Sequence, residues 1–185
     1  GPLGQGIAMA VGMAMAEERM AAHFNREGYP VVDNYTYALC GDGCLQEGVA
    51  AEAASFAGTQ KLGKLILFYD RNYITIEGRI ESTFDEDVNG RFAAYGWQVQ
   101  ELPDGEDMEA IAKAIEAAKA ATDKPSVIIV NTQIAHGTPK QGKASAHGEP
   151  LGDENIKAMR EFYQWDYAPF EVPAEVYAHF DELKK

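Results

Sequence analysis

Two short apolar runs constrain the fold of this chain more than any other feature. Residues 65–69 and 127–130 consist of Val, Ile, Leu and Phe with a single tyrosine. Strands with this composition are buried on both faces, which is typical of parallel sheets. Parallel neighbours need a crossover connection, and that connection is usually a helix. The two runs therefore predict an α/β fold: a doubly wound parallel sheet with helices on both faces.

The rest of the chain follows the same alternation. Residues 35–40 and 97–99 are predicted as further strands. Residues 132–152 are rich in Gly, Lys and His without an apolar period, so we expect a long loop, a feature that is often functional. Helical spacing and composition predict helices over residues 4–24, 45–60, 85–95, 108–121, 155–163 and 173–183.

Composition excludes some classes of partner. The formal net charge of the 185 residues is −13, whereas a nucleic-acid surface needs a basic stripe. No apolar run approaches the roughly 20 residues that cross a membrane. No signal peptide is visible, so we expect a cytoplasmic protein with no membrane partner. Phosphorylated substrates remain possible, because a few local amides, cations or a metal can hold them.

A candidate binding site follows two of the strands. Gly41, Asp42 and Gly43 come after the strand at 35–40, where backbone amides and glycines let a diphosphate approach the main chain. The carboxylate of Asp42 suits a magnesium or calcium ion, because both take oxygen ligands. Asn72 follows the next strand and would add an amide oxygen at the same sheet edge, with the carbonyl of Ile74 as a third ligand. Gly-Asp-Gly followed 30 positions later by Asn is the two-part signature of thiamine diphosphate binding.

Several longer motifs match one family that carries this signature. The motifs lie at residues 1–6, 41–48, 57–66, 74–78, 91–97, 147–152 and 167–170. In these motifs the chain resembles transketolases from its first residue almost to its last. Tyr73 departs from the pattern, because many relatives carry a small or polar residue there, but Asn72 and Ile74 remain in place.

The resemblance implies roles for individual residues. It implies that the cofactor is thiamine diphosphate with Mg²⁺ or Ca²⁺. His147 would reach the diphosphate and the substrate from the long loop. Glu47, with Glu52, would belong to an acidic cluster that links two active sites across a dimer interface. The cofactor's rings would lie along Gly1, Pro2 and Leu3, its diphosphate would accept from the Gly43 amide, and its metal would be held by Asp42, Asn72 and the Ile74 carbonyl.

The reaction implied is transfer of a two-carbon ketol unit from a ketose phosphate to an aldose phosphate, a step of the pentose phosphate pathway. The cofactor carries the difficult chemistry. Sugar phosphates would be the substrates, and the enzyme would be a homo-oligomer. We interpret residues 1–185 as the diphosphate- and metal-binding domain.

Transketolases are longer than this chain. In the family, an amino-terminal stretch supplies histidines, and a pyrimidine-binding domain or subunit supplies a glutamate that activates the cofactor. The chain would then be a truncation, a proteolytic piece or one part of a split enzyme, inactive by itself.

The sequence also fits other interpretations. Residues 1–4 also match the remnant of a cleaved tag, and His147 or Glu47 could be solvated side chains. Dihydroxyacetone synthase, deoxyxylulose-phosphate synthase and 2-oxo-acid dehydrogenases share the two-part signature. A non-catalytic binding or assembly fragment belongs to a different functional class, but such a relative should have lost Asp42 or Asn72.

Overall fold

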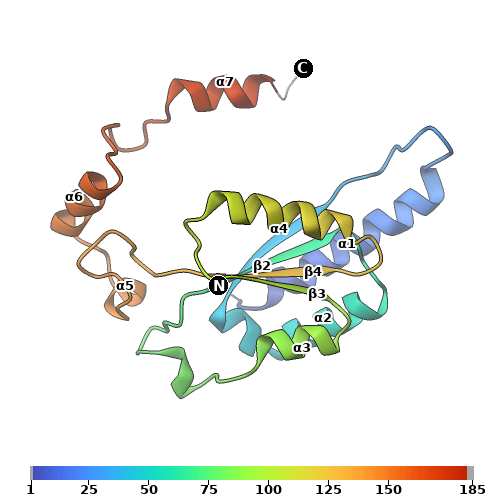
Figure 1. Cartoon of the computed structure of the whole chain (residues 1–185), viewed down its shortest axis with the longest axis horizontal. Helices are drawn as coiled ribbons and strands as arrows, with labels where there is room; N and C mark the ends of the chain where they lie inside the picture. Colours follow the sequence, from blue (N-terminus) through green and yellow to red (C-terminus); the bar gives the residue numbers. More distant parts are fainter. Residues whose placement is uncertain (1, 183–185) are drawn as a thin grey trace.

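The chain folds around a single parallel sheet. In the computed structural model, which describes residues 2–182, helices cover both faces of this sheet (Figure 1). The strands are β1 (Thr36–Gly41), β2 (Leu65–Arg71), β3 (Gln98–Leu102) and β4 (Ser126–Asn131), in the order β1-β2-β4-β3. The predicted fold class and all four predicted strands are confirmed.

The helices divide between the faces as the handedness of crossover connections requires. From β1 to β2 and on to β3 the chain moves in one direction across the sheet, and it then steps back to β4. Right-handed crossovers place the helices of opposite steps on opposite faces. Accordingly, α1 (Gln5–Phe24), α2 (Gly48–Thr59) and α3 (Val88–Ala94) pack on one face, and α4 (Met108–Ala120) packs on the other.

Alternate side chains of the central strands pack into two separate hydrophobic cores, one on each face of the sheet. In β2, Leu65, Leu67 and Tyr69 face α1, α2 and α3, whereas Ile66 faces α4. In β4, Val127 and Ile129 face the first core, and Ile128 faces the second. Because successive side chains of a strand point to opposite faces, burial on both faces explains the continuous apolar runs.

The strand register aligns the carboxyl ends of three strands. Gly41 at the end of β1 lies opposite Asp70 of β2, and Arg71 at the end of β2 lies opposite Asn131 of β4. The residues that immediately follow these strands therefore emerge together at one edge of the sheet.

Two predicted helices begin later than expected. The chain after β1 forms a 3₁₀ helix, η1 (Asp42–Gln46), and Glu47 is extended before α2 begins at Gly48. The expected helix over 45–60 is therefore wrong in its first turn, because the tight Gly-Asp-Gly turn uses those residues. The expected helix over 85–95 begins at Val88, since the Asp87 side chain caps it by accepting from the Gly90 amide at 2.9 Å.

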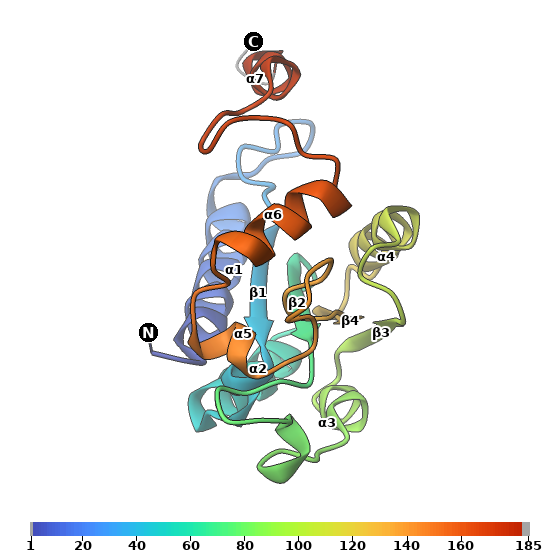
Figure 2. The same cartoon turned by 90° about the vertical axis from the view of Figure 1, so that its left-hand side faces the viewer.

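The last third of the chain extends beyond the sheet. The long loop after β4 contains a short helix, α5 (Ser145–Gly148), beyond the carboxyl ends of the strands (Figure 1). It leads to α6 (Asp153–Phe162) and α7 (Ala174–Glu182), and α7 lies apart from the sheet in both views (Figure 2). A further 3₁₀ turn, η2 (Ile80–Ser82), follows β2. Within residues 2–182, none of the helices combines the length and apolar character that crossing a membrane requires.

Candidate functional site

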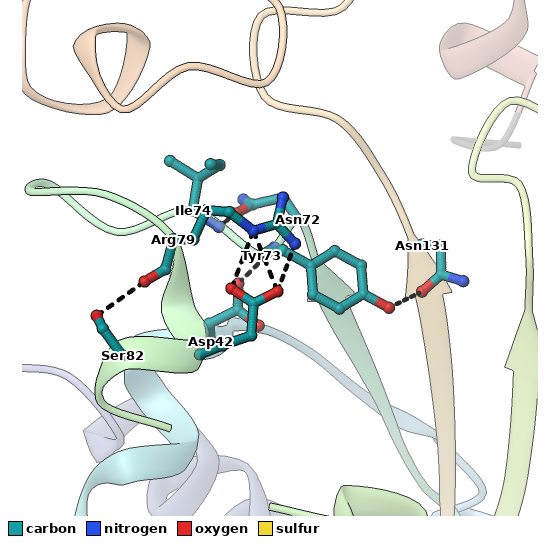
Figure 3. Close-up of polar contacts among 8 residues, drawn as sticks. Asp42, Asn72, Tyr73, Ile74, Arg79, Ser82 and Asn131 are labelled. Atoms are coloured by element: carbon teal, nitrogen blue, oxygen red, sulfur yellow. Dashed lines mark hydrogen bonds and ion pairs between the residues drawn. The ribbon is translucent and has the colours of Figure 1, made fainter. Parts of the chain in front are cut away.

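Asp42 is a buried carboxylate at the carboxyl edge of the sheet. Its residue is 4% exposed, and it is the first residue of η1 after β1. One carboxylate oxygen accepts from the Tyr69 hydroxyl. The other accepts from the Tyr73 amide at 3.1 Å (Figure 3). The Asn72 amide also donates to this carboxylate. The donors to Asp42 are thus neutral groups from β2 and the turn that follows it.

The electrostatic environment of Asp42 favours a cation. Burial raises the pKa of its carboxyl, although hydrogen bonds from Tyr69 and the Tyr73 amide oppose this shift. Among the described residues, Lys and Arg form no ion pair with Asp42. Buried charges in proteins are normally paired or coordinate a metal. A carboxylate has about four acceptor positions, and the three donors leave room for one more bond.

Asn72 and Ile74 bring two further oxygens to the same turn. The Asn72 side-chain oxygen accepts from the Ile74 amide at 3.0 Å, which leaves one of its two lone pairs available. Ile74 pairs with Arg79 in a small hairpin, where Tyr73 and Thr75 rather than Ile74 make the backbone hydrogen bonds. The Ile74 carbonyl accepts from none of the described residues. One carboxylate, one amide oxygen and one carbonyl fit the donor set that Mg²⁺ and Ca²⁺ prefer.

This donor set differs from a cluster of ionisable ligands. Within the described residues, His, Cys, Asp and Glu side chains form no group of three that could hold a metal ion. The candidate site instead combines one acid with two neutral oxygens. Such a site leaves positive charge on the ion for a diphosphate.

The turn between Asn72 and Ile74 adopts an unusual backbone conformation. Tyr73 has φ 63°, in the left-handed region that bulky residues seldom occupy. This conformation costs a residue with a Cβ about 1–2 kcal/mol. It allows the Tyr73 amide to donate to Asp42 while the Tyr73 carbonyl accepts from the Ile80 amide at 2.9 Å.

The amino-terminal segment packs against η1. Gly1 lies outside the described residues, and Pro2 is exposed. Leu3 lies beside Gly43, because a Cβ built on Gly43 would stand 3.0 Å from Leu3 Cδ1. Gly4 has φ 76°, and a Cβ there would stand 2.7 Å from the Glu47 Cβ. The segment and the Gly-Asp-Gly turn thus approach closely, as expected of two parts of one site.

His147 occupies the loop that returns over the carboxyl edge. It lies in α5 and is exposed. The adjacent Gly148 packs on Ile76, where a Cβ would stand 3.2 Å from Ile76 Cγ1. The fold therefore brings α5 to the turn that carries Asn72 and Ile74. The contacts of the described residues do not join the His147 side chain to Asp42 or Asn72.

The side chains of Glu47 and Glu52 form no hydrogen bond or ion pair among the described contacts. Glu47 is exposed between η1 and α2, and its side chain does not cap α2. Glu52 is exposed on α2. Their exposure is compatible with the expected subunit interface.

Comparison with known proteins identifies the family. The family model for the thiamine diphosphate binding domain of transketolase matches residues 1–185. The chain belongs to the transketolase family. Transketolase from Streptococcus pyogenes is 58% identical over 180 residues, and transketolase 1 from Escherichia coli is 55% identical over 182 residues.

The matches cover the chain but only part of each transketolase. The two bacterial matches cover 97% and 98% of this chain but 25% and 28% of those proteins. The structure of transketolase from Leishmania mexicana superposes with a TM-score of 0.93 at 47% identity, over 98% of this chain and 28% of that one. A transketolase mutant from Pichia stipitis in complex with fructose 6-phosphate gives a TM-score of 0.94 at 45% identity, covering 98% and 27%. The chain thus spans about a quarter of the length of these transketolases.

Residues around the transketolase signature include two that sequence reasoning missed. Tyr69 was predicted only as the end of a buried strand, but its hydroxyl contacts Asp42. A signal was available, because a buried tyrosine hydroxyl usually needs a partner. Arg91 lies in the motif at residues 91–97, for which the sequence predicts no role in the site. Both of its terminal nitrogens instead donate to the Leu45 carbonyl at 3.2 Å and so support η1.

A polar cavity of about 670 Å³ adjoins the transketolase signature on the side of β3 and β4. Its lining includes Asn72, Tyr73, Asn131 and His136. The Nδ1 of His136 lies 3.0 Å from the Tyr163 hydroxyl, and its ring packs edge-on against Phe162. It therefore joins the long loop to α6. Asp42 and His147 are not among the residues that line this cavity.

Proposed function

We propose that this chain provides the diphosphate and metal site of a transketolase. The enzyme would transfer a two-carbon ketol unit from a ketose phosphate to an aldose phosphate. The observation that carries the proposal is the buried Asp42 carboxylate, which lacks a cationic partner among the described residues and lies with Asn72 and Ile74. A family degenerate in function would not be expected to retain this donor set.

Three oxygens would hold the metal. Asp42 would supply the negative charge, and Asn72 and the Ile74 carbonyl would complete the protein ligands without neutralising the ion. Mg²⁺ is the ion we favour, and Ca²⁺ would be accepted by the same oxygen donors. Thiamine diphosphate, when bound, supplies the nucleophilic carbon that accepts the ketol unit.

The other residues would orient the cofactor and the substrate. The Gly43 amide would donate to the diphosphate, and Gly1, Pro2 and Leu3 would line the rings. His147 would approach from α5 and donate to the diphosphate and to the substrate. The placement of Leu3 beside Gly43 and of Gly148 beside Ile76 supports a single cleft bounded by these segments.

The substrates and partners are inferred from the relatives. Structures of the Pichia stipitis transketolase are complexes with fructose 6-phosphate, xylulose 5-phosphate and sedoheptulose 7-phosphate. We therefore propose sugar phosphates as substrates, in the pentose phosphate pathway of the cytoplasm. A pyrimidine-binding domain or subunit would complete the cleft. Glu47 and Glu52 would face the second subunit of a homodimer.

A calorimetric titration tests the proposal. Thiamine diphosphate is titrated into the protein with and without Mg²⁺, and binding should require the metal. Asp42→Asn removes the only carboxylate ligand and should weaken metal-dependent binding by a factor of about a hundred or more. Metal-independent binding, or unchanged binding by this variant, would refute the site.

Asp70→Asn is the matched control. Asp70 lies near the end of β2, and its carboxylate accepts a hydrogen bond from the Thr132 hydroxyl. The side-chain oxygen of an asparagine can accept the same hydrogen bond. The control makes the same change in charge close to Asp42. It should retain metal-dependent binding within about tenfold, or 1.4 kcal/mol.

A further inference from the structure

Tyr73 is the central residue of the candidate metal turn. It lies between Asn72 and Ile74 and occupies the left-handed region, with φ 63°. A glycine would adopt this conformation without strain, whereas tyrosine does not. The side chain must therefore make contacts that offset the strained backbone.

Two arginine side chains lie over the Tyr73 ring, one from before the turn in the sequence and one from after it. The Arg71 guanidinium lies over the ring at 5.5 Å from its centroid, and the Arg79 guanidinium lies over it at 6.0 Å. Both distances are within the range of a cation–π interaction. Arg71 is itself anchored, because it forms an ion pair with Glu101 of β3.

The Tyr73 hydroxyl forms a hydrogen bond with β4. It donates to the Asn131 side-chain oxygen at 3.3 Å, as Figure 3 shows, and Arg71 Nε donates to the same oxygen at 2.7 Å. The two donors occupy both lone pairs of that oxygen. The Tyr73 side chain is therefore joined to three strands, through Arg71 of β2, Asn131 of β4 and, by way of Arg71, Glu101 of β3.

The backbone of Tyr73 faces the candidate metal ligands. Its amide donates to Asp42 Oδ2 at 3.1 Å, and the flanking residues carry the other two oxygens. We propose that Tyr73 is a positioning residue whose anchored side chain keeps this turn in the left-handed conformation, so that Asp42, Asn72 and Ile74 present their oxygens together. The inference rests on the proposed function, because it concerns the same metal site.

Amide hydrogen exchange in the metal-free protein tests the positioning directly. Protection factors of residues 73 and 74 are compared among the wild type, Tyr73→Phe, Tyr73→Gly and Tyr73→Ala. Phe keeps the ring contacts and should retain most of the protection. Gly loses the anchors but also the strain. Its protection should fall about tenfold, because the loss of one hydrogen bond and two cation–π contacts is partly offset by the relief of strain. Ala loses the anchors and keeps the strain, so its protection should fall further.

Lys61→Gly is the control for strain alone. Lys61 also has a positive φ, 54°, and its exposed side chain follows α2. Glycine there should raise the melting temperature, because it relieves strain without removing an anchor. If Tyr73→Gly behaved in the same way, with protection equal to or above that of the wild type, the anchoring role would be overturned.

Metal affinity separates this inference from the proposed function. Mg²⁺ is titrated into each variant in the presence of thiamine diphosphate. Affinity should follow the order of the protection factors, and Phe should rescue most of what Gly and Ala lose. Equal Mg²⁺ affinity in the wild type, Gly and Ala variants would overturn the inference. Failure of the wild type to bind Mg²⁺ would overturn the proposed function instead. In that case the order of the amide protection factors among the variants would by itself show whether Tyr73 positions the turn.

Discussion

At the scale of single residues, the candidate site depends on one buried charge and its neutral donors. Asp42 is almost inaccessible, and the Tyr69 hydroxyl is one of its three donors. Burial and the nearby Asp42 raise the pKa of Tyr69, so the phenol remains a donor. A hydrogen bond to a charged group contributes more to stability than one between neutral groups. Tyr69 should therefore stabilise the carboxylate in the folded protein even without a metal.

Tyr69→Phe tests this role. The variant keeps the ring in the core but leaves a buried carboxylate oxygen without its donor. We expect the free energy of unfolding in urea to fall by about 1–3 kcal/mol. Tyr29→Phe serves as the control, because Tyr29 is 74% exposed and its loss of a hydroxyl should cost less than about 0.5 kcal/mol. Equal unfolding midpoints for the two variants would contradict the assignment.

At the scale of elements, the long loop is tied to α6 by a close approach at one glycine. Gly137 has φ 78°, and a Cβ there would stand 2.5 Å from Phe162 Cδ1. The adjacent His136 contacts both Phe162 and Tyr163. The position of α6 thus depends on the same loop that carries His147. A substitution at Gly137 should therefore alter the packing of both the long loop and α6.

Gly137→Ala should loosen α6 from the loop. Gly142→Ala is the matched control, because Gly142 also has a positive φ, 68°, but a Cβ there would meet nothing within 4 Å. Both variants carry backbone strain, and only the first adds a clash. We expect Gly137→Ala to be less stable than the control by about 1–3 kcal/mol, with faster hydrogen exchange over residues 153–163. Identical exchange in the two variants would show that the contact with Phe162 does not hold α6.

At the scale of the whole molecule, α1 leaves a broad apolar face uncovered. Met9 and Met13 lie one turn apart on this helix and are 60% and 62% exposed, and Phe24 at its end is 55% exposed. Large exposed apolar patches mark interaction sites or cause self-association. On α2, Val49 and Phe56 are also exposed, at 44% and 41%. Both helices therefore offer apolar surface for self-association.

We expect the isolated chain to self-associate through this face. Sedimentation velocity should show a dimer in the wild type, and the double variant Met9→Gln, Met13→Gln should shift it toward monomer. Met108→Gln, which changes a methionine that is 71% exposed near the start of α4, should leave the dimer intact. A monomeric wild type, or equal dissociation in the control, would contradict the assignment of the interface.

We also expect the 185-residue chain to lack ketol transfer by itself. The chain spans about a quarter of the transketolases that it matches. The resemblance implies that the glutamate that activates the cofactor belongs to another domain. A coupled assay with ketose and aldose phosphates should therefore detect no turnover. Addition of the pyrimidine-binding domain and the amino-terminal stretch should restore it. Robust turnover by the chain alone would contradict this division of labour.

The amino-acid sequence by itself determined the strands, the fold class and the metal-ligand candidates. Burial on both faces leaves a continuous apolar run, so β2 and β4 could be recognised from composition alone. The signature of Asp42 and Asn72 could be recognised because each follows one of the predicted strands. These features depend on local composition and on short spacings along the chain.

Only the tertiary structure decided which side chains serve the candidate ligands. Tyr69 reaches Asp42 across 27 positions, and Tyr73 reaches Asn131 across 58. Such pairs depend on strand register and on the order β1-β2-β4-β3, in which strands distant in sequence lie side by side. The left-handed conformation of Tyr73 likewise opposes its local preference and persists where contacts from other elements outweigh that preference. The spacing of residues along the sequence does not indicate these contacts, because they form only when the sheet assembles.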